Sequence, residues 1–237
     1  MGALETLLSV QEHDTVIDQL VHRRAHMAER AELAAVQARI AEVDGRRADA
    51  QARRDDVAAR QGRLEHDVVS VEARITDIEK RMYSGAVSAS RELQAMSAEV
   101  ESLTARRSSL EDDVLASMEE AEPIDDELGR LLAERSAHDA EAERLTAAIA
   151  EAEVAIDAEL VVERSTRDEL AASVPDDLLS TYERLRGKLG GVGAARLVGS
   201  SCTGCHLTLP ATELDRIRRA PADTVVFCDQ CGRILVP

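Results

Sequence analysis

The sequence of 237 residues has almost no aromatic side chains: it contains no tryptophan, one phenylalanine and two tyrosines. Globular cores of this size usually depend on such rings, so their scarcity argues against an ordinary globular core. No run approaches the roughly 18 consecutive apolar residues that a membrane span requires. The residues present are 44% hydrophobic, chiefly aliphatic, and 32% charged. This composition is typical of long helices that meet along a narrow apolar stripe.

Cysteine is also scarce, and its four residues form two CxxC pairs, Cys202 with Cys205 and Cys228 with Cys231. Each pair directs two thiolates at one point, and two pairs complete the tetrahedral shell that structural Zn²⁺ takes at about 2.3 Å. The loop between the pairs is slightly longer than the usual ~15–20 residues, and a short helix within it accounts for the excess. We therefore predict one structural zinc ion held by all four cysteines.

Three other uses of the cysteines fit less well. Two disulfides would need an oxidising compartment, and no secretory signal pattern stands at the N-terminus. A thioredoxin-like redox CxxC needs one pair in a βαβ setting, not two pairs in a small tail. Iron bound as in rubredoxin has similar spacing and stays open. A shell of four thiolates leaves no position for a metal-bound water, so we expect the metal to do no chemistry.

Acidic residues outnumber basic ones, and the formal net charge is −17. The acidic excess falls within residues 1–185, whereas residues 186–237 carry a small basic excess. Because an acidic segment repels nucleic acid, only the C-terminal part is expected to approach it. We expect a cytoplasmic protein with no membrane partner and no small-molecule substrate.

Apolar residues recur at alternating steps of three and four in two long segments, residues 33–82 and 93–156. A spacing of 3.5 sustained over many heptads predicts a coiled coil. The turn-rich residues 83–90 separate two arms of similar length, which predicts an intramolecular antiparallel hairpin over residues 1–173. Two helices that pair with other chains in a parallel dimer would show the same periodicity, so that alternative stays open.

Three features interrupt the pattern. The register shifts before Leu33, which predicts a stutter in the first arm. Arginine and alanine occupy stripe positions between Val43 and Val57, so this stretch is expected to pack loosely. Pro123 should kink the second arm or begin a new helix there.

The remaining residues predict two smaller parts. Residues 174–193 should form a short helix, with Pro175 in its first turn, and a glycine-rich hinge. Residues 194–237 should form the C4 zinc ribbon, in which so little surface is buried that folding and metal binding are one event. Its expected elements are a helix over residues 210–219 and short strands over residues 195–198, 206–209, 224–227 and 233–236. The predicted fold is mainly α: a long antiparallel coiled-coil hairpin with a small C-terminal β zinc ribbon.

The chain resembles the bacterial C4-type zinc-ribbon proteins built on a long coiled-coil hairpin, and it looks like an actinobacterial member. The resemblance lies in Val174-Pro175, in Tyr182-Glu-Arg-Leu-Arg186, in the paired CxxC and in the ending Cys228-Asp-Gln-Cys-Gly-Arg-Ile-Leu235. It implies a non-enzymatic adaptor whose ribbon is associated with nucleic-acid binding. Some members of this family are linked to the alternative sigma-54 factor and to flagellar or type III secretion partners.

Two functions are therefore open. In the first, arginines in the ribbon contact the phosphates of nucleic acid, because guanidinium groups bind phosphate bidentately. The candidate residues are Arg196, Arg216, Arg218, Arg219 and Arg233. The same arginines would be unavailable if they pair with carboxylates of the hairpin. In the second, the acidic hairpin is a protein-interaction scaffold or chaperone-like adaptor that attracts basic partners.

An enzyme is the third and poorest interpretation. The glycine-rich residues 187–193 lack the lysine and the pattern of a phosphate-binding loop. The six histidines are scattered, although His22 and His26 share a helix face with Glu29 and suggest a second metal site. Exposed helical histidines usually hold no metal. Because neither the glycine-rich segment nor the histidines form an active-site pattern, we predict no catalytic residues.

Overall fold

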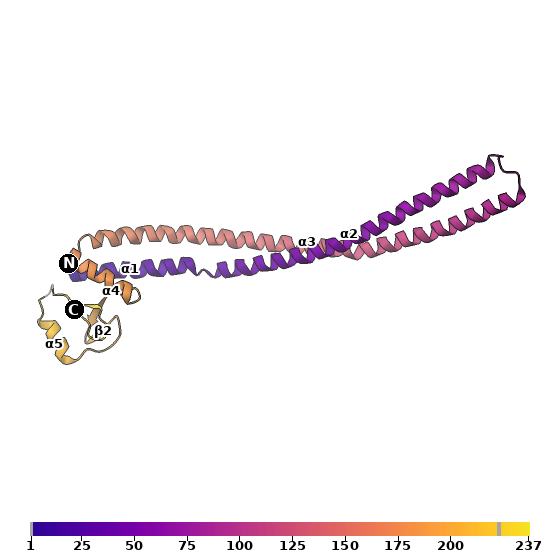
Figure 1. The fold of residues 1–237 in the computed structure, drawn as a ribbon. Coiled ribbons are helices and arrows are strands. Elements are labelled where there is room, and N and C mark those ends of the chain that lie inside the picture. Colours follow the sequence, from indigo (N-terminus) through magenta and orange to yellow (C-terminus); the bar gives the residue numbers. More distant parts are fainter. Residues whose placement is uncertain (1, 222–223) are drawn as a thin grey trace. The chain divides into compact units, whose positions relative to one another are not determined.

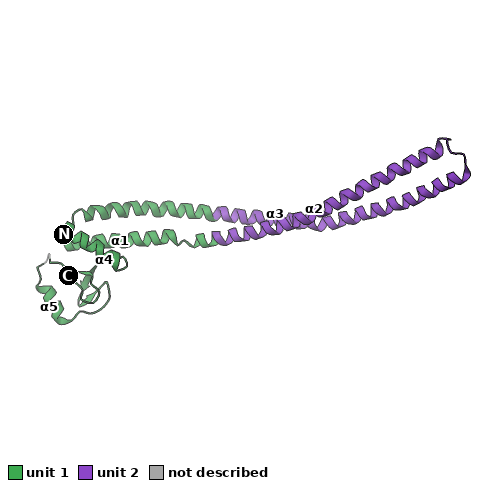
Figure 2. Cartoon of the chain, viewed as in Figure 1, with its two compact units in different colours: residues 1–32, 145–237 green, residues 33–144 purple. Residues whose placement is uncertain are grey.

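The computed structural model describes residues 2–221 and 224–237, which contain five helices and four short strands (Figure 1). These are α1 (Ala3–Ala25), α2 (Ala28–Tyr83), α3 (Ser90–Ala171), α4 (Asp176–Lys188), β1 (Ala194–Val198), β2 (Ser201–Cys202), α5 (Ala211–Arg219), β3 (Val226–Phe227) and β4 (Ile234–Val236). The chain divides into two compact units, one of residues 1–32 with 145–237 and one of residues 33–144 (Figure 2). A search of the described helices finds none that is long and apolar enough to cross a bilayer.

The unit of residues 33–144 is an antiparallel pair formed by α2 and α3. Ion pairs across the two helices show the direction: Arg46 meets Glu134 at 2.6 Å, and Arg60 meets Glu120 at 2.8 Å. Residue numbers rise along one helix as they fall along the other, so the pair is antiparallel. Both helices are consecutive elements of this one chain. This confirms the predicted intramolecular hairpin. Such exposed pairs contribute little to stability, whereas the buried stripe between the helices supplies most of it.

Between Val43 and Val57, where the sequence predicts loose packing, the stripe contains one buried residue. Ala50 is fully buried, and its small side chain lets the helices approach closely. The neighbouring Arg54 extends out of the interface to Asp125, at 2.8 Å. The looser packing stays a prediction, and one apolar cluster spans the stretch. Its buried members are Val43, Ala50, Val57, Ala121, Ile124 and Leu131.

Helix continuity bears on two of the expected interruptions. α3 continues as one helix through Pro123, so no new helix begins there, and the alternative of a kink stays a prediction. Packing of the stripe on both sides of the proline holds the helix together despite the missing amide donor. The first arm is two helices that break at His26–Met27, in the stretch before Leu33 where the register shift is predicted. There the backbone amide of His26 bonds the carbonyl of His22 at 3.0 Å and closes the last turn of α1.

The other unit joins the ends of the hairpin to the ribbon through a four-stranded sheet in the order β2-β1-β4-β3. β1 and β4 are parallel, and the outer strands pair antiparallel to them. The side chains of β4 alternate between two cores: Ile234 and Val236 pack against α1 and α4, and Leu235 packs against the cysteines. One core thus includes α1, α4 and the sheet. The segment limits that we predict at residues 173 and 193 stay proposals.

One predicted strand, residues 206–209, is wrong. Only Thr208 forms a bridge, to Ser201. His206 has φ of 61°, in the left-handed region, which ends any extended segment at this point.

Candidate metal centre and ribbon surface

The four cysteine sulfurs lie within 4.8 Å of one another. The Sγ atoms of Cys202 and Cys231 are 3.9 Å apart, and those of Cys205 and Cys228 are 4.0 Å apart. These separations are far longer than a disulfide bond of about 2.05 Å, and all four thiols are free. A tetrahedron with Zn–S bonds of about 2.3 Å has edges of about 3.8 Å. The arrangement is a C4 site that fits one structural zinc.

The backbone of each CxxC pair forms a tight turn that we call a knuckle: residues 202–206 and 228–232. In the first, the amide of His206 bonds the carbonyl of Cys202 at 2.8 Å; in the second, that of Gly232 bonds Cys228 at 2.7 Å. The residue after the second cysteine is left-handed in both knuckles, with φ of 61° at His206 and 73° at Gly232. The two knuckles therefore have the same backbone conformation. Only the second has glycine, the residue that adopts a left-handed conformation without strain, at this position.

This asymmetry predicts opposite effects of two substitutions. His206→Gly should stabilise the ribbon by about 0.5–1 kcal/mol, because glycine removes the left-handed strain and the exposed imidazole loses few contacts. Gly232→Ala should cost about 1 kcal/mol, although a Cβ there meets no atom within 4 Å. The measurement is the chelator concentration that removes half of the zinc, which should rise for the first variant and fall for the second. Equal shifts in both would contradict this account.

The thiols differ in proton affinity before a metal binds. Burial raises the pKa of Cys228 to about 12, although the backbone amides of Gln230 and Cys231 partly offset it. For Cys231, burial is outweighed by hydrogen bonds, chiefly from the backbone and side chain of Arg233, and the pKa falls to about 7. Because zinc binds thiolates, metal binding releases protons and weakens as the pH falls. Four sulfur ligands would leave the ion no open position, so it would stabilise the fold only.

A polar contact that sequence reasoning missed fastens the ribbon to α1. The side chain of Gln11 accepts hydrogen bonds from the amides of Gly193, at 2.7 Å, and Ala194, at 3.3 Å. Its amide group donates to the carbonyl of Gly191 at 3.0 Å. Arg233 adds bonds to two further carbonyls in this segment. The predicted glycine-rich hinge stays a prediction, and its motion would require these bonds to break.

A second contact, also missed, is the buried carboxylate of Asp14. It accepts a hydrogen bond from the hydroxyl of Tyr182 at 2.6 Å and another from Arg167 at 3.2 Å, and Arg186 lies 3.5 Å away. Burial, followed by the hydrogen bond to Asp14, raises the pKa of Tyr182. The only sequence signal is a polar residue on the apolar face of the first helix. The cluster ties α1, α3 and α4 together at the end of the hairpin that carries the ribbon.

The five arginines predicted to contact nucleic acid fall into two groups. Arg196 bonds both oxygens of Glu5, at 2.7 and 3.1 Å, and this hydrogen bond lowers the pKa of Glu5. Arg233 is half-buried, and its stem crosses Gly204, where a Cβ would lie 2.5 Å from it. Both are occupied within the protein: Arg196 pairs with a carboxylate of the hairpin, and Arg233 donates to the carbonyls of Leu189 and Val192.

The other three arginines lie on α5 and are exposed. Arg216 is 3.6 Å from Asp229, and Arg219 is 2.6 Å from Asp215, yet their side chains are 63% and 78% exposed. Arg218 forms no ion pair within the described part of the chain. On the same helix, Ile217 is buried in the ribbon core, and the buried carboxylate of Glu213, 3.9 Å from Arg216, accepts a hydrogen bond from the amide of Asp229. These contacts hold the arginines outward.

The suggested second metal site does not assemble. The rings of His22 and His26 stack at 4.0 Å, and His26 bonds the backbone of His22. Across residues 2–221 and 224–237, the cysteines are the one group of three or more ligand-type side chains close enough to share an ion.

Comparison with known proteins decides the family. Residues 10–190 match the CT398-like coiled coil hairpin domain, and residues 201–235 match the C4-type zinc ribbon domain. The chain belongs to the CT398-like hairpin family. The match confirms the predicted resemblance and the predicted fold class.

Several relatives of this CT398-like protein cover its whole length. The uncharacterized protein MT2288 of Mycobacterium tuberculosis is 32% identical, over 98% of this chain and 94% of its own. A solved structure from Mycobacterium smegmatis has a TM-score of 0.88 and 28% identity, and the match covers 100% and 99% of the two chains. CT398 from Chlamydia trachomatis, at 24% identity, has a TM-score of 0.69 over 99% and 97% of the chains and shares the fold. The mycobacterial relatives agree with the actinobacterial resemblance.

Proposed function

We propose that this protein is a non-enzymatic adaptor whose zinc ribbon binds nucleic acid weakly through α5. One zinc ion, with Cys202, Cys205, Cys228 and Cys231 as its ligands, holds the ribbon in shape. The observation that carries the proposal is the outward arginine face of α5, with Arg216, Arg218 and Arg219 exposed on a helix anchored by Ile217. We also propose the cytoplasm as its location, because free thiols persist in a reducing compartment.

Charge sets the strength of this binding. The whole chain carries a formal net charge of −17, and its acidic excess opposes the approach of phosphates. Three arginines that contact phosphate release about two to three counterions from single-stranded RNA. Binding should therefore be weak, should depend on salt and should show little preference for base sequence, since the ribbon offers only Phe227 for base stacking.

The prediction concerns the full-length zinc-loaded protein and a labelled 20-nucleotide RNA. In fluorescence anisotropy, the logarithm of affinity should fall with the logarithm of salt with a slope of about −2. The triple variant R216Q/R218Q/R219Q should lose most of the affinity and nearly all of the slope. Duplex DNA is measured in parallel, because phosphate contacts alone do not discriminate between the two.

A matched control separates α5 from general charge. R63Q/R91Q/R106Q removes three exposed arginines from the hairpin and changes the net charge equally. The affinity of this control for RNA should stay within about twofold of that of wild type, because it loses charge but no phosphate contact. If the two triple variants lose affinity to the same extent, or the wild type shows no salt-dependent binding, the proposal is wrong.

A further inference from the structure

The unit of residues 33–144 exposes large apolar side chains beside the coiled-coil stripe. Val69 is 63% exposed, Leu115 57% and Met118 52%. At the same level, the stripe itself contains Gln61, which is half-buried, and the buried residues Ser117 and Ala121. Along this stretch the stripe alternates such small or polar residues with larger ones, among them the buried Leu110, and further large apolar side chains face outward. Apolar side chains exposed in this way add nothing to the stability of a two-helix coil.

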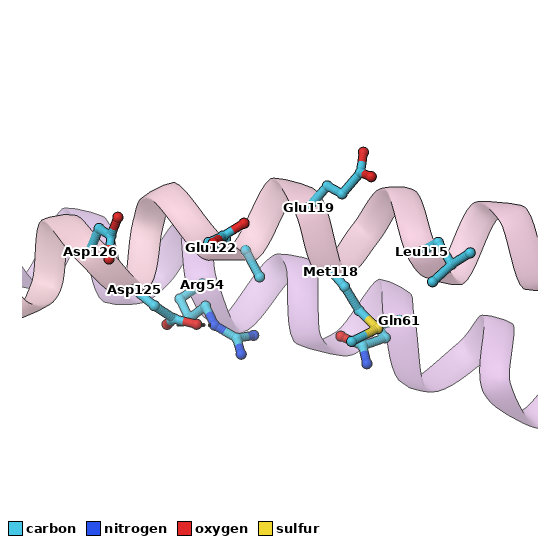
Figure 3. Close-up of a pocket in the computed structure, with 9 residues that line it drawn as sticks. Arg54, Gln61, Leu115, Met118, Glu119, Glu122, Asp125 and Asp126 are labelled. Carbon is cyan, nitrogen blue, oxygen red and sulfur yellow. Dashed lines mark hydrogen bonds and ion pairs between the residues drawn. The ribbon is translucent and has the colours of Figure 1, made fainter.

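Two adjoining grooves follow this exposed surface, and Leu115 borders both. One, of about 420 Å³, lies between Val68 and Val69 of α2 and Val114 and Leu115 of α3. The other, of about 600 Å³, extends along α3 past Met118 to Asp126 (Figure 3). We call Val69, Leu115, Met118 and the two grooves the lateral patch.

The charges around the lateral patch are almost all negative. Its walls include Glu65, Glu111, Glu119, Glu122, Asp125 and Asp126. The one basic residue is Arg54, which bonds Asp125 at 2.8 Å, as Figure 3 shows. Glu119, Glu122 and Asp126 have no basic side-chain partner among the described residues. Their uncompensated charge favours a cationic ligand.

We propose that the lateral patch is the docking site for a basic amphipathic helix of a partner protein. A groove between two helices accepts a third helix, which buries apolar side chains at i, i+3 or i+4, and i+7. Leu115 and Met118 would contact that stripe, and lysine or arginine beside it would face the carboxylates. From residue 111 to residue 126 the patch runs about 22 Å along α3, which matches a helix of about 15 residues.

Other occupants fit the same surface less well. A second copy of this chain would bring its own net charge of −17 against the carboxylates. The basic helix of this chain, α5, has its apolar face in the ribbon core. Nucleic acid is repelled by the acidic walls. The lateral patch shares no residue with the α5 surface, so this proposal can be tested independently of nucleic-acid binding.

The test uses the full-length protein and a labelled 15-residue helical peptide of leucine and lysine with a single apolar stripe. A scrambled peptide of the same composition, which has no such stripe, is the reference. Wild type should bind the amphipathic peptide at least tenfold more tightly than the scrambled one, and L115Q/M118Q should remove that difference. L132Q/V154Q, which alters two apolar residues that are 60% and 72% exposed outside the patch, should bind as wild type does.

Two further measurements keep the outcome decisive. E119Q/E122Q should weaken binding about three- to tenfold and reduce its salt dependence. Because the altered side chains are exposed, every variant should keep the helical circular dichroism of wild type. The proposal is overturned if L115Q/M118Q binds like wild type, if the control pair loses binding equally, or if sedimentation shows that the patch joins two copies of this chain instead.

Discussion

Removal of the metal from the full-length protein should unfold the ribbon and leave the hairpin folded. The buried ribbon core contains Ala195, Cys202, Leu209, Ile217, Cys228 and Leu235, so two of its six fully buried members are themselves ligands. So small a core cannot offset the chain entropy that folding removes. Binding of structural zinc supplies roughly 10–16 kcal/mol in comparable small domains. Hydrogen exchange after treatment with a chelator should therefore show lost protection around the ligands, in residues 201–219 and 226–232.

The hairpin supplies the internal control for that experiment. The stripe of α2 and α3 in residues 33–144 uses no metal, so its amides should exchange as slowly as before. One equivalent of zinc should restore the protection of the ribbon, and Cys228→Ser should behave like the chelated wild type even when zinc is present. Full protection of the ribbon without any metal would contradict the structural role of the ion.

Structural features of this protein that depend on residues close together in the sequence can be predicted, whereas contacts between residues far apart in the sequence cannot. The coiled-coil stripe and the CxxC knuckles are local patterns that repeat or stand at fixed spacing, so fold class and ligand residues could be predicted. The break at His26–Met27 was signalled only as a shift of register. The pairing of Arg196 with Glu5 joins residues far apart in the chain, and no local pattern distinguishes Arg196 from the exposed Arg218.

The lateral patch is another feature that local sequence patterns do not predict. In the sequence, Leu115 and Met118 look like ordinary helical residues. Their exposure can be inferred only when the structure shows that Ser117 and Ala121 occupy the buried stripe. Asp14 and Gln11 are two of many polar residues in the first helix, so composition does not mark them as buried. Their partners come from residues 167–194, which no property of the first helix identifies.

Replacement of Asp14 should have the largest effect of any single change outside the zinc site. Asp14→Ala leaves Arg167 and Arg186 without their shared buried carboxylate and leaves the hydroxyl of Tyr182 without an acceptor. Removal of one member of a buried charge pair costs about 3–5 kcal/mol, and the partial exposure of both arginines places this case near about 3 kcal/mol. Hydrogen exchange of α4 should accelerate by about 100-fold. Asp112→Ala, an exposed change on α3, should leave it unaltered.

Tyr182 adds a pH dependence whose sign follows from its pKa. Burial and the hydrogen bond to Asp14 raise that pKa above the usual value of 10.0, so the folded protein keeps the phenolic proton when the unfolded chain releases it. The contribution of Tyr182 to stability is thus constant below pH 10 and falls as the pH rises beyond it. Tyr182→Phe should cost about 1 kcal/mol at pH 7 and should flatten the decline above pH 10 in the exchange of α4. If the wild type and the variant lose protection in parallel as the pH rises, Tyr182 is not the group responsible.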